Sequence, residues 1–339
     1  MCERDVPSGS RQIMEEIKMR IDVQCHIFPK IIQDYMLQNP YPKCFRTNDA
    51  LICDFGSQIL ALADDKYDPA SILKSMDEGK VDIALISPNI PDPGFLPPDK
   101  AAELCVKLNE ETQEITDHSN GRFFGIGLLP WHNPAEAVKE VSHIKSLGMK
   151  GVMLFSRNGD LQVDDKQLEP VYDAVAAAGL PVLIHPTVPM WADSIGDYGM
   201  VAANSFVIDT AFAFLRLVYG GIMDRHPQMK VVMPHAGGVL PFLDGRLAPA
   251  RAEIPAGEAR NVKEVMFGDQ TWFDLANHSP NILGYFKNYL GLSRAMYATD
   301  YPFASHVMAT ALQDRMGFTS DELKEINWKN ANRLFDLGL

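Results

Sequence analysis

The chain has 339 residues, 46% of them hydrophobic, and a formal net charge of −13 at pH 7. A chain of this length and apolar content can bury a full core, and α/β barrels of this size commonly form a single domain. The negative charge argues against nucleic acid and against an anionic membrane as partners, because both require a basic surface. We therefore expect neither of these partners.

The N-terminus and the cysteines bear on location. Residues 1–20 contain several acidic side chains and no continuous apolar segment, so they are not typical of a secretory signal. No stretch reaches the apolar length that a transmembrane helix requires. The five cysteines are odd in number and form no CxxC pair, which favours reduced thiols in a cytoplasmic protein. We expect an N-terminal extension over residues 1–20 and one domain over residues 21–339.

Short runs rich in Val, Ile and Leu, bounded by turn residues, are typical of buried parallel strands. The first such run covers residues 21–26, and a long irregular segment with Pro40, Pro42 and Gly56 follows it. We expect this segment, about residues 30–68, to form loops or a small insert over the mouth of a barrel. Seven further strands are predicted at residues 81–86, 123–129, 151–155, 180–185, 230–235, 271–275 and 295–300.

Segments with helical patterns separate these strands. Gly148 supplies a helix stop before the fourth strand, and Thr319 followed by Glu322 has the spacing of a capping box. Residues 319–339 are therefore expected to form one or two closing helices. The alternation of eight strands with helices predicts an α/β fold of the (β/α)8 TIM barrel type. The other predicted helices cover residues 69–78, 100–119, 134–147, 168–178, 206–225 and 282–289.

Four of the strand-like runs end on residue types that bind metals. They end at His26, His185, His235 and Asp300. A polar side chain at the C-terminal tip of a barrel strand points to the face where such folds build active sites. Three imidazoles and a carboxylate placed there are typical of a catalytic divalent metal. A core histidine bonded to the backbone, or an aspartate that caps a turn, is the alternative at each position, but four coincident placements favour a shared site.

Gln24 shares a strand face with His26, because side chains two residues apart in a strand point the same way. Its amide oxygen can bind the metal directly or through water. The alternative is a hydrogen bond from Gln24 to the substrate, with the metal held by three ligands, His26, His185 and Asp300. These donors suit Zn²⁺ first and Mn²⁺ as the alternative ion. We assign no chemistry to the other six histidines, but His306 is noted because it follows Asp300 closely.

At these motifs the chain resembles the amidohydrolase superfamily, and specifically its branch of α-amino-β-carboxymuconate-ε-semialdehyde decarboxylase and related metal-dependent decarboxylases. The most specific segments are His235-Ala236-Gly237-Gly238 and Thr299-Asp300-Tyr301-Pro302-Phe303. The resemblance implies that His235 is an acid/base beside the metal. It implies metal ligands at Gln24, His26, His185 and Asp300.

The resemblance also implies residues that bind the substrate. Arg246 is expected to help bind a carboxylate, because the planar guanidinium pairs with both carboxylate oxygens; an ordinary surface ion pair is the alternative. Arg46, in the insert, is a weaker candidate for the same role. Trp191 is expected to form an aromatic wall of the pocket, unless it is a packed core side chain. The family resemblance further implies a homodimer or a higher homo-oligomer.

Position 24 departs from the family, which usually has histidine or glutamate where this chain has Gln24. A neutral amide leaves the metal more positive than a carboxylate does and binds it less firmly than an imidazole. The implied activity is non-oxidative decarboxylation of a small aromatic or unsaturated carboxylic acid, with His235 or Asp300 exchanging the proton. Hydrolysis of a lactone, ester or amide requires the same ligands and is the second hypothesis. An inactive ligand-binding pseudoenzyme is the third.

Overall fold

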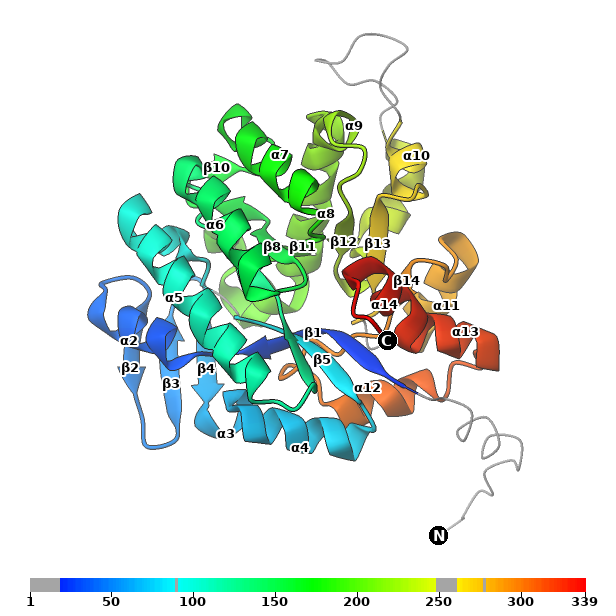
Figure 1. Cartoon of the computed structure of the whole chain (residues 1–339), viewed down its shortest axis with the longest axis horizontal. Coiled ribbons are helices and arrows are strands. Elements are labelled where there is room, and N and C mark those ends of the chain that lie inside the picture. The colour runs from blue at the N-terminus through cyan, green and yellow to red at the C-terminus, as the bar shows by residue number, and fades with distance from the viewer. Residues whose placement is uncertain (1–18, 89–90, 248–260, 277–278) are drawn as a thin grey trace.

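The computed structural model describes residues 19–88, 91–247, 261–276 and 279–339 (Figure 1). Most of the predicted N-terminal extension and His278 lie outside these residues. Within them the chain has an α/β fold, in which parallel strands alternate with helices. The parallel strands form two sheets, with the orders β1-β5-β6 and β14-β13-β12-β11-β8-β7.

The parallel strands are short and almost entirely buried, because helices cover the side of each sheet that would otherwise face solvent. This confirms the prediction from the apolar runs, with small shifts in the strand ends. The strands are β1 (Ile21–Ile27), β5 (Ile83–Pro88), β6 (Phe123–Gly125), β7 (Gly127–Leu128), β8 (Val152–Phe155), β11 (Val182–His185), β12 (Val231–Met233), β13 (Thr271–Asp274) and β14 (Ala295–Met296).

The strand ends differ from the prediction at three of the four expected ligands. β11 ends at His185 as expected, but β1 extends one residue beyond His26. β12 ends two residues before His235, and β14 ends four residues before Asp300. His235 and Asp300 have φ angles of 56° and 59°, in the left-handed region that cannot continue a strand. Both residues therefore lie in turns after their strands.

The segment predicted as loops or a small insert contains a separate antiparallel sheet. After α2 (Lys30–Gln38), three strands pair in the order β2-β3-β4, and α3 (Asp64–Tyr67) follows them (Figure 1). The register places Cys44 opposite Cys53, with their Sγ atoms 2.9 Å apart, and both are free thiols. The strands are β2 (Lys43–Arg46), β3 (Ala50–Asp54) and β4 (Ile59–Ala63). Later in the chain, two strands of two residues each, β9 (Arg157–Asn158) and β10 (Leu161–Gln162), form a short hairpin.

The helices agree with the predicted ranges to within a few residues, except that one predicted helix is divided into two. The predicted helix over residues 206–225 is two helices, because Gly221, with a φ of 75°, starts a new turn. The helices are α4 (Pro69–Gly79), α5 (Pro98–Asp117), α6 (Pro134–Leu147), α7 (Glu169–Ala178), α8 (Phe206–Tyr219), α9 (Ile222–Arg225), α10 (Val262–Met266), α11 (Pro280–Tyr289), α12 (His306–Gln313), α13 (Ser320–Lys324) and α14 (Asn330–Phe335). Short 3-10 helices cover Pro93–Phe95, Lys166–Leu168, Ala192–Ile195, Asp197–Gly199, His235–Gly237 and Leu240–Arg246, and π-helical turns cover Val201–Ser205 and Glu325–Lys329.

One continuous helical stretch, Asp197–Tyr219, is long and apolar enough to cross a membrane by length and composition alone. This departs from the expectation that no segment reaches that limit. Half of its apolar window is buried inside the molecule, as in the core helices of globular proteins. The stretch is therefore weak support for a membrane span.

The capping box predicted at the C-terminal helices is present. Thr319 Oγ1 accepts from the backbone N–H of Glu322, and Glu322 Oε2 accepts from the backbone N–H of Thr319 at 2.8 Å. We predict that Thr319→Ala lowers the free energy of unfolding by about 1 kcal/mol, because the first turn loses its side-chain acceptor. Urea denaturation measures this, with Thr319→Ser as the control that keeps the oxygen. Equal losses in the two variants would contradict the prediction.

Candidate metal centre

Two of the expected ligands, Gln24 and His26, project from β1 toward the same carboxylate. Both side chains are buried. Nε2 of His26 lies 3.1 Å from Oδ1 of Asp300, and Nε2 of Gln24 donates to the same oxygen at 3.2 Å. The spacing of two residues along the strand therefore places both side chains on one face, as the sequence predicts.

His185 and Asp300 complete the cluster from two other parts of the fold. Nε2 of His185, at the end of β11, lies 3.3 Å from Nε2 of His26, with the two rings edge to face. Asp300 comes from the turn after β14, where its backbone N–H donates to the carbonyl oxygen of Gln24 at 2.9 Å. The four predicted ligands thus meet, although 276 positions separate Gln24 from Asp300 in the sequence.

Both imidazoles direct Nε2 into the cluster and bind a protein oxygen through Nδ1. Nδ1 of His185 donates to the carbonyl oxygen of Pro186 at 2.8 Å, and Nδ1 of His26 lies 3.2 Å from Oγ of Ser87. Burial, reinforced by the His26 ring, lowers the pKa of His185 to about 3. His185 is therefore neutral, with a lone pair on Nε2. This is the form of imidazole that binds a metal ion.

Asp300 and Gln24 are the members of the cluster that carry oxygen atoms. Burial raises the pKa of Asp300, but the hydrogen bond with His26 and the neighbouring imidazoles outweigh it, so that the pKa lies below its usual value. Oε1 of Gln24 is buried and has no hydrogen-bond partner in the described part of the chain. An unpaired buried acceptor costs about 1–3 kcal/mol. Two imidazole nitrogens, a carboxylate and an unpaired amide oxygen fit the donor set of a divalent cation.

His235 lies beside this cluster and is held by its own partners. Nδ1 of its ring lies 3.2 Å from the carbonyl oxygen of Ala276, and its backbone N–H donates to Oδ1 of Asp274 at 2.8 Å. The imidazole of His235 affects the pKa values of both Asp300 and His185. It is therefore within electrostatic range of the ligands, and its Nε2 is available to exchange a proton.

The sequence analysis missed Asp274, the last residue of β13. Its Oδ1 accepts from the backbone N–H groups of His235 and Ala276, at 2.8 and 3.1 Å, and so fixes the turn that carries His235. Burial raises the pKa of Asp274 to about 6. A signal was present in the sequence, because the run over residues 271–274 also ends on a carboxylate.

A second residue that the sequence analysis missed is Arg157, which starts β9 directly after the tip of β8. Its Nη1 and Nη2 donate to the carbonyl oxygens of Gly159 and Val188, at 2.9 and 3.2 Å. Its Nε is buried without a partner among the residues described. Burial raises the pKa values of Asp92 and Asp209, and the charge of Arg157 opposes both shifts. Arg157 is therefore a fixed cation at the carboxyl ends of the strands.

The predicted substrate-binding residues are not joined to the four ligands by any hydrogen bond within the described ranges. Arg46, on β2, is exposed and pairs with Asp64 at 2.6 Å. Arg246 is exposed at the end of the 3-10 helix Leu240–Arg246. Trp191 is half-buried, just before the 3-10 helix Ala192–Ile195. Their roles stay predictions.

Parallel strands that bring imidazoles and a carboxylate to one buried point are typical of metal-dependent enzymes with an α/β fold. The sequence profile of the family described as Amidohydrolase matches residues 21–337. The chain belongs to this family, which confirms the resemblance found in the sequence.

The chain is 25% identical to 2-amino-3-carboxymuconate-6-semialdehyde decarboxylase of Dictyostelium discoideum, over 95% of this chain and 92% of that protein. Its structure is similar to that of 5-carboxyvanillate decarboxylase from Sphingomonas paucimobilis, with a TM-score of 0.81, 23% identity and coverage of 94% and 99%. It is also similar to a dihydroxybenzoic acid decarboxylase from Polaromonas sp. JS666, with a TM-score of 0.77, 23% identity and coverage of 95% and 98%. The Polaromonas structure holds manganese and the inhibitor 2-nitroresorcinol.

Loss of a residue that hydrogen-bonds to a metal ligand weakens metal binding by roughly 10–100-fold. We predict that His185→Ala weakens the binding of Zn²⁺ or Mn²⁺ by more than this. The reason is that the variant removes a neutral imidazole from the centre of the cluster. Competition with a chromophoric chelator measures the affinity. His118→Ala is the matched control, because His118 is exposed at the end of α5. Equal affinities in the two variants would exclude His185 as a ligand.

A second prediction concerns the pH dependence of stability. Because folding raises the pKa of Asp274 to about 6, its contribution to stability is present below its unfolded pKa, near 3.9, and is lost as the pH rises through 6. Asp274→Asn removes this loss. The free energy of unfolding of the variant, relative to wild type, is expected to rise by up to about 3 kcal/mol between pH 4 and pH 7. Urea titrations of metal-free protein test this; a difference that is constant with pH would refute it.

Proposed function

We propose that this protein is a metal-dependent non-oxidative decarboxylase, a carboxy-lyase that acts on a small aromatic or unsaturated carboxylic acid. The observation that supports this most is the convergence of four ligand side chains in a member of the amidohydrolase family. The three similar proteins described above are decarboxylases of such acids. Their names favour decarboxylation over hydrolysis, which the same ligands can also support.

We also propose that the parallel strands close into a (β/α)8 barrel within one domain over residues 21–339. β6 and β7 are two parts of one chain segment, which pairs with β5 on one side and with β8 on the other. At the opposite edges, the backbone N–H of Val23 donates to the carbonyl oxygen of Tyr297 at 3.1 Å, and that of His26 to Tyr301 at 2.9 Å. These contacts connect the two sheets at both edges, which supports closure.

In the proposed reaction, the bond between the substrate carbon and its carboxyl group breaks, CO₂ leaves, and the electron pair that stays on carbon takes up a proton. The divalent cation supplies a Lewis acid that withdraws charge from the substrate carboxylate or an adjacent hydroxyl. His235 and Asp300 are the two residues that exchange the proton. Nδ1 of His235 donates to the carbonyl oxygen of Ala276, so its Nε2 is the nitrogen that exchanges the proton. Nε2 of His235 and the ionised carboxylate of Asp300 each have to take up a proton before they can donate it to carbon.

Substrate recognition is assigned to the arginines near the carboxyl ends of the strands. Arg157 is held by two backbone carbonyl groups and keeps Nε unpaired, so that an anionic oxygen of the substrate finds an oriented donor. Arg246 and Arg46 are the further candidates for this role. Trp191 is proposed as an aromatic wall of the pocket.

We infer Zn²⁺ as the cation, with Mn²⁺ as the alternative, because two imidazoles and oxygen donors suit both ions. The manganese in the Polaromonas structure supports the second ion. A homodimer or higher homo-oligomer is proposed from the exposed aromatic side chains of Phe212, on α8, and Phe242. A cytoplasmic location stays a prediction.

The function is tested by incubating the metal-loaded protein with a panel of hydroxybenzoic acids and unsaturated dicarboxylic acids. We expect stoichiometric CO₂, measured by trapping, together with the decarboxylated product. His235→Asn is expected to lower kcat by about 10²–10⁴-fold, because a positioned proton donor is lost, whereas His118→Ala keeps the wild-type rate. Opening of a lactone or cleavage of an ester without CO₂ would establish the hydrolase instead. Metal binding without turnover of any of these compounds would favour the pseudoenzyme.

A further inference from the structure

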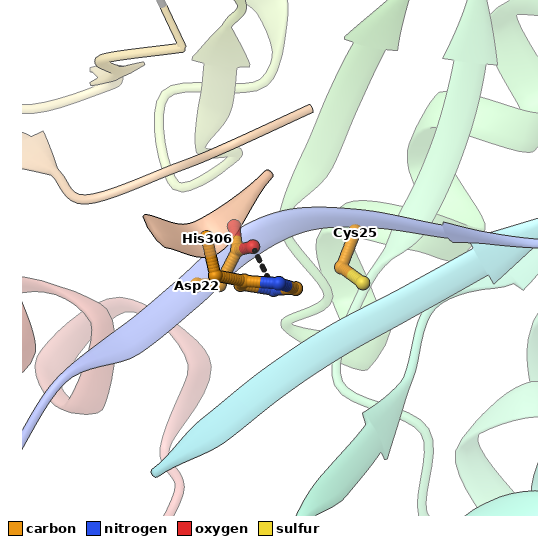
Figure 2. Close-up of side chains that lie close together, drawn as sticks. All are labelled: Asp22, Cys25 and His306. Atoms are coloured by element: carbon orange, nitrogen blue, oxygen red, sulfur yellow. Dashed lines mark ion pairs between the residues drawn. The ribbon is translucent and has the colours of Figure 1, made fainter. Parts of the chain in front are cut away.

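Asp22, on β1, and His306, the first residue of α12, form a buried carboxylate–imidazole pair (Figure 2). Nε2 of His306 lies 3.2 Å from Oδ2 of Asp22, and both side chains are fully buried. The register of β1 against β5 shifts between Asp22 and Cys25. The side chains of these two residues then lie together with His306, with their ligand-type atoms within 4.8 Å of one another.

The carboxylate of Asp22 accepts hydrogen bonds from both chain segments that carry metal ligands. Its Oδ1 accepts from the backbone N–H groups of Gln24 and Thr299, each at 3.0 Å. The hydroxyl of Thr299 donates to Oδ2 and accepts from the backbone N–H of Tyr301 at 3.0 Å. Asp22 therefore links the strand of Gln24 and His26 to the turn that carries Asp300.

The turn at Asp300 depends on such links because its backbone is in an unfavourable conformation. A φ of 59° is uncommon for a residue other than glycine. Each residue of the turn is bonded to β1: Thr299 to Asp22, and Asp300 to the carbonyl oxygen of Gln24. Tyr301 accepts from the backbone N–H of His26 at 2.9 Å. A change at Asp22 is therefore transmitted to the position of the Asp300 carboxylate.

His306 holds the Asp22 carboxylate from the other side. Nδ1 of His306 lies 2.9 Å from Oγ of Ser75, on α4, and its ring stacks on Tyr301 with centroids 4.9 Å apart. The packing is tight: a Cβ on Gly79 would lie 2.4 Å from Cβ of His306. The backbone of His306 is therefore packed directly against the end of α4, which fixes the point from which the imidazole extends.

We propose that Asp22 and His306 are positioning residues, which fix the distance between Gln24 and Asp300 and thereby set the affinity and geometry of the metal centre. This inference rests on the proposed function, because it requires a metal at the four ligands. Neither residue contacts the substrate in this proposal. Their effect passes through the hydrogen bonds of Asp22 to the backbone on either side of the centre.

A second metal site at Asp22, Cys25 and His306 fits the structure less well. The oxygens of Asp22 already accept from Gln24 and Thr299. The cluster is therefore better described as a support for the neighbouring centre.

The test compares two changes at His306 with a matched change elsewhere. His306→Leu removes the imidazole nitrogen that faces Asp22, whereas His306→Gln keeps a polar amide on a side chain of similar reach. His226→Leu is the control, because His226 is buried and paired with Glu169 at 3.0 Å, with no contact to the metal ligands. Each variant is titrated with Co²⁺, its visible absorption spectrum is recorded, and its free energy of unfolding is measured separately.

We expect His306→Leu to weaken Co²⁺ binding by about 10–100-fold, which is the range for loss of a residue that orients a metal ligand. We also expect the visible absorption bands of the bound Co²⁺ to shift. His306→Gln is expected to restore both toward wild type. His226→Leu is expected to lose stability with an unchanged spectrum. If His306→Leu does not fold, Thr299→Val, which removes the hydroxyl between Asp22 and Tyr301, is expected to change the spectrum in the same direction.

Three outcomes would overturn the inference. Equal Co²⁺ affinity and identical spectra in wild type, His306→Leu and Thr299→Val would exclude the positioning role while leaving the metal centre intact. A stoichiometry of two Co²⁺ ions per chain in wild type and one in His306→Leu would show that these residues form a second metal site instead. Wild-type protein that takes up no Co²⁺ would refute the metal centre itself, and the proposed function with it.

Discussion

The contact between His26, His185 and Asp300 is the constraint on which the rest of the structure depends. Two ring nitrogens face each other at 3.3 Å, and a carboxylate oxygen lies 3.1 Å from one of them. Burying such groups is unfavourable unless each is paired. Hydrogen bonds through the far ring nitrogens keep both imidazoles in place, and the proposed divalent cation would satisfy the atoms that point inward.

Two buried carboxylates serve the same purpose at different turns. Asp274 accepts from the backbone N–H groups around His235, and Asp22 accepts from those around Asp300. Both turns contain a residue with a φ in the left-handed region. At each turn the chain departs from the strand, and backbone N–H groups lose their partners in the sheet. A neighbouring aspartate accepts hydrogen bonds from these N–H groups, so the turn can present a functional side chain. The residues that hold the turns are thus distinct from those proposed to bind the metal and the substrate.

Much of the fold, and the proximity of the four candidate ligands, could be predicted from the sequence. Buried parallel strands can be recognised in the sequence because both of their faces are apolar. His185 is the last residue of its strand, as predicted. The exact ends at His235 and Asp300 were not predictable, since they depend on φ angles that hydrogen bonds from distant residues impose. Arg157 was missed because an arginine after a strand has no spacing that distinguishes it. The partnership of Asp22 with His306 was missed because the two residues lie far apart in the sequence and no motif spacing links them.

The amide at position 24 has a consequence for the kind of molecule that the centre admits. In the proposed centre, a divalent ion would be held by one carboxylate and three neutral donors and would retain one unit of positive charge. A monoanionic acid bound there brings the sum to zero, and in a buried site electroneutrality is favoured strongly. Glutamate in place of Gln24 would reach neutrality before any ligand arrived. If Gln24 is a ligand as proposed, its uncharged side chain leaves the positive charge to be balanced by the incoming acid, and the centre is expected to bind anions in preference to neutral molecules of the same shape.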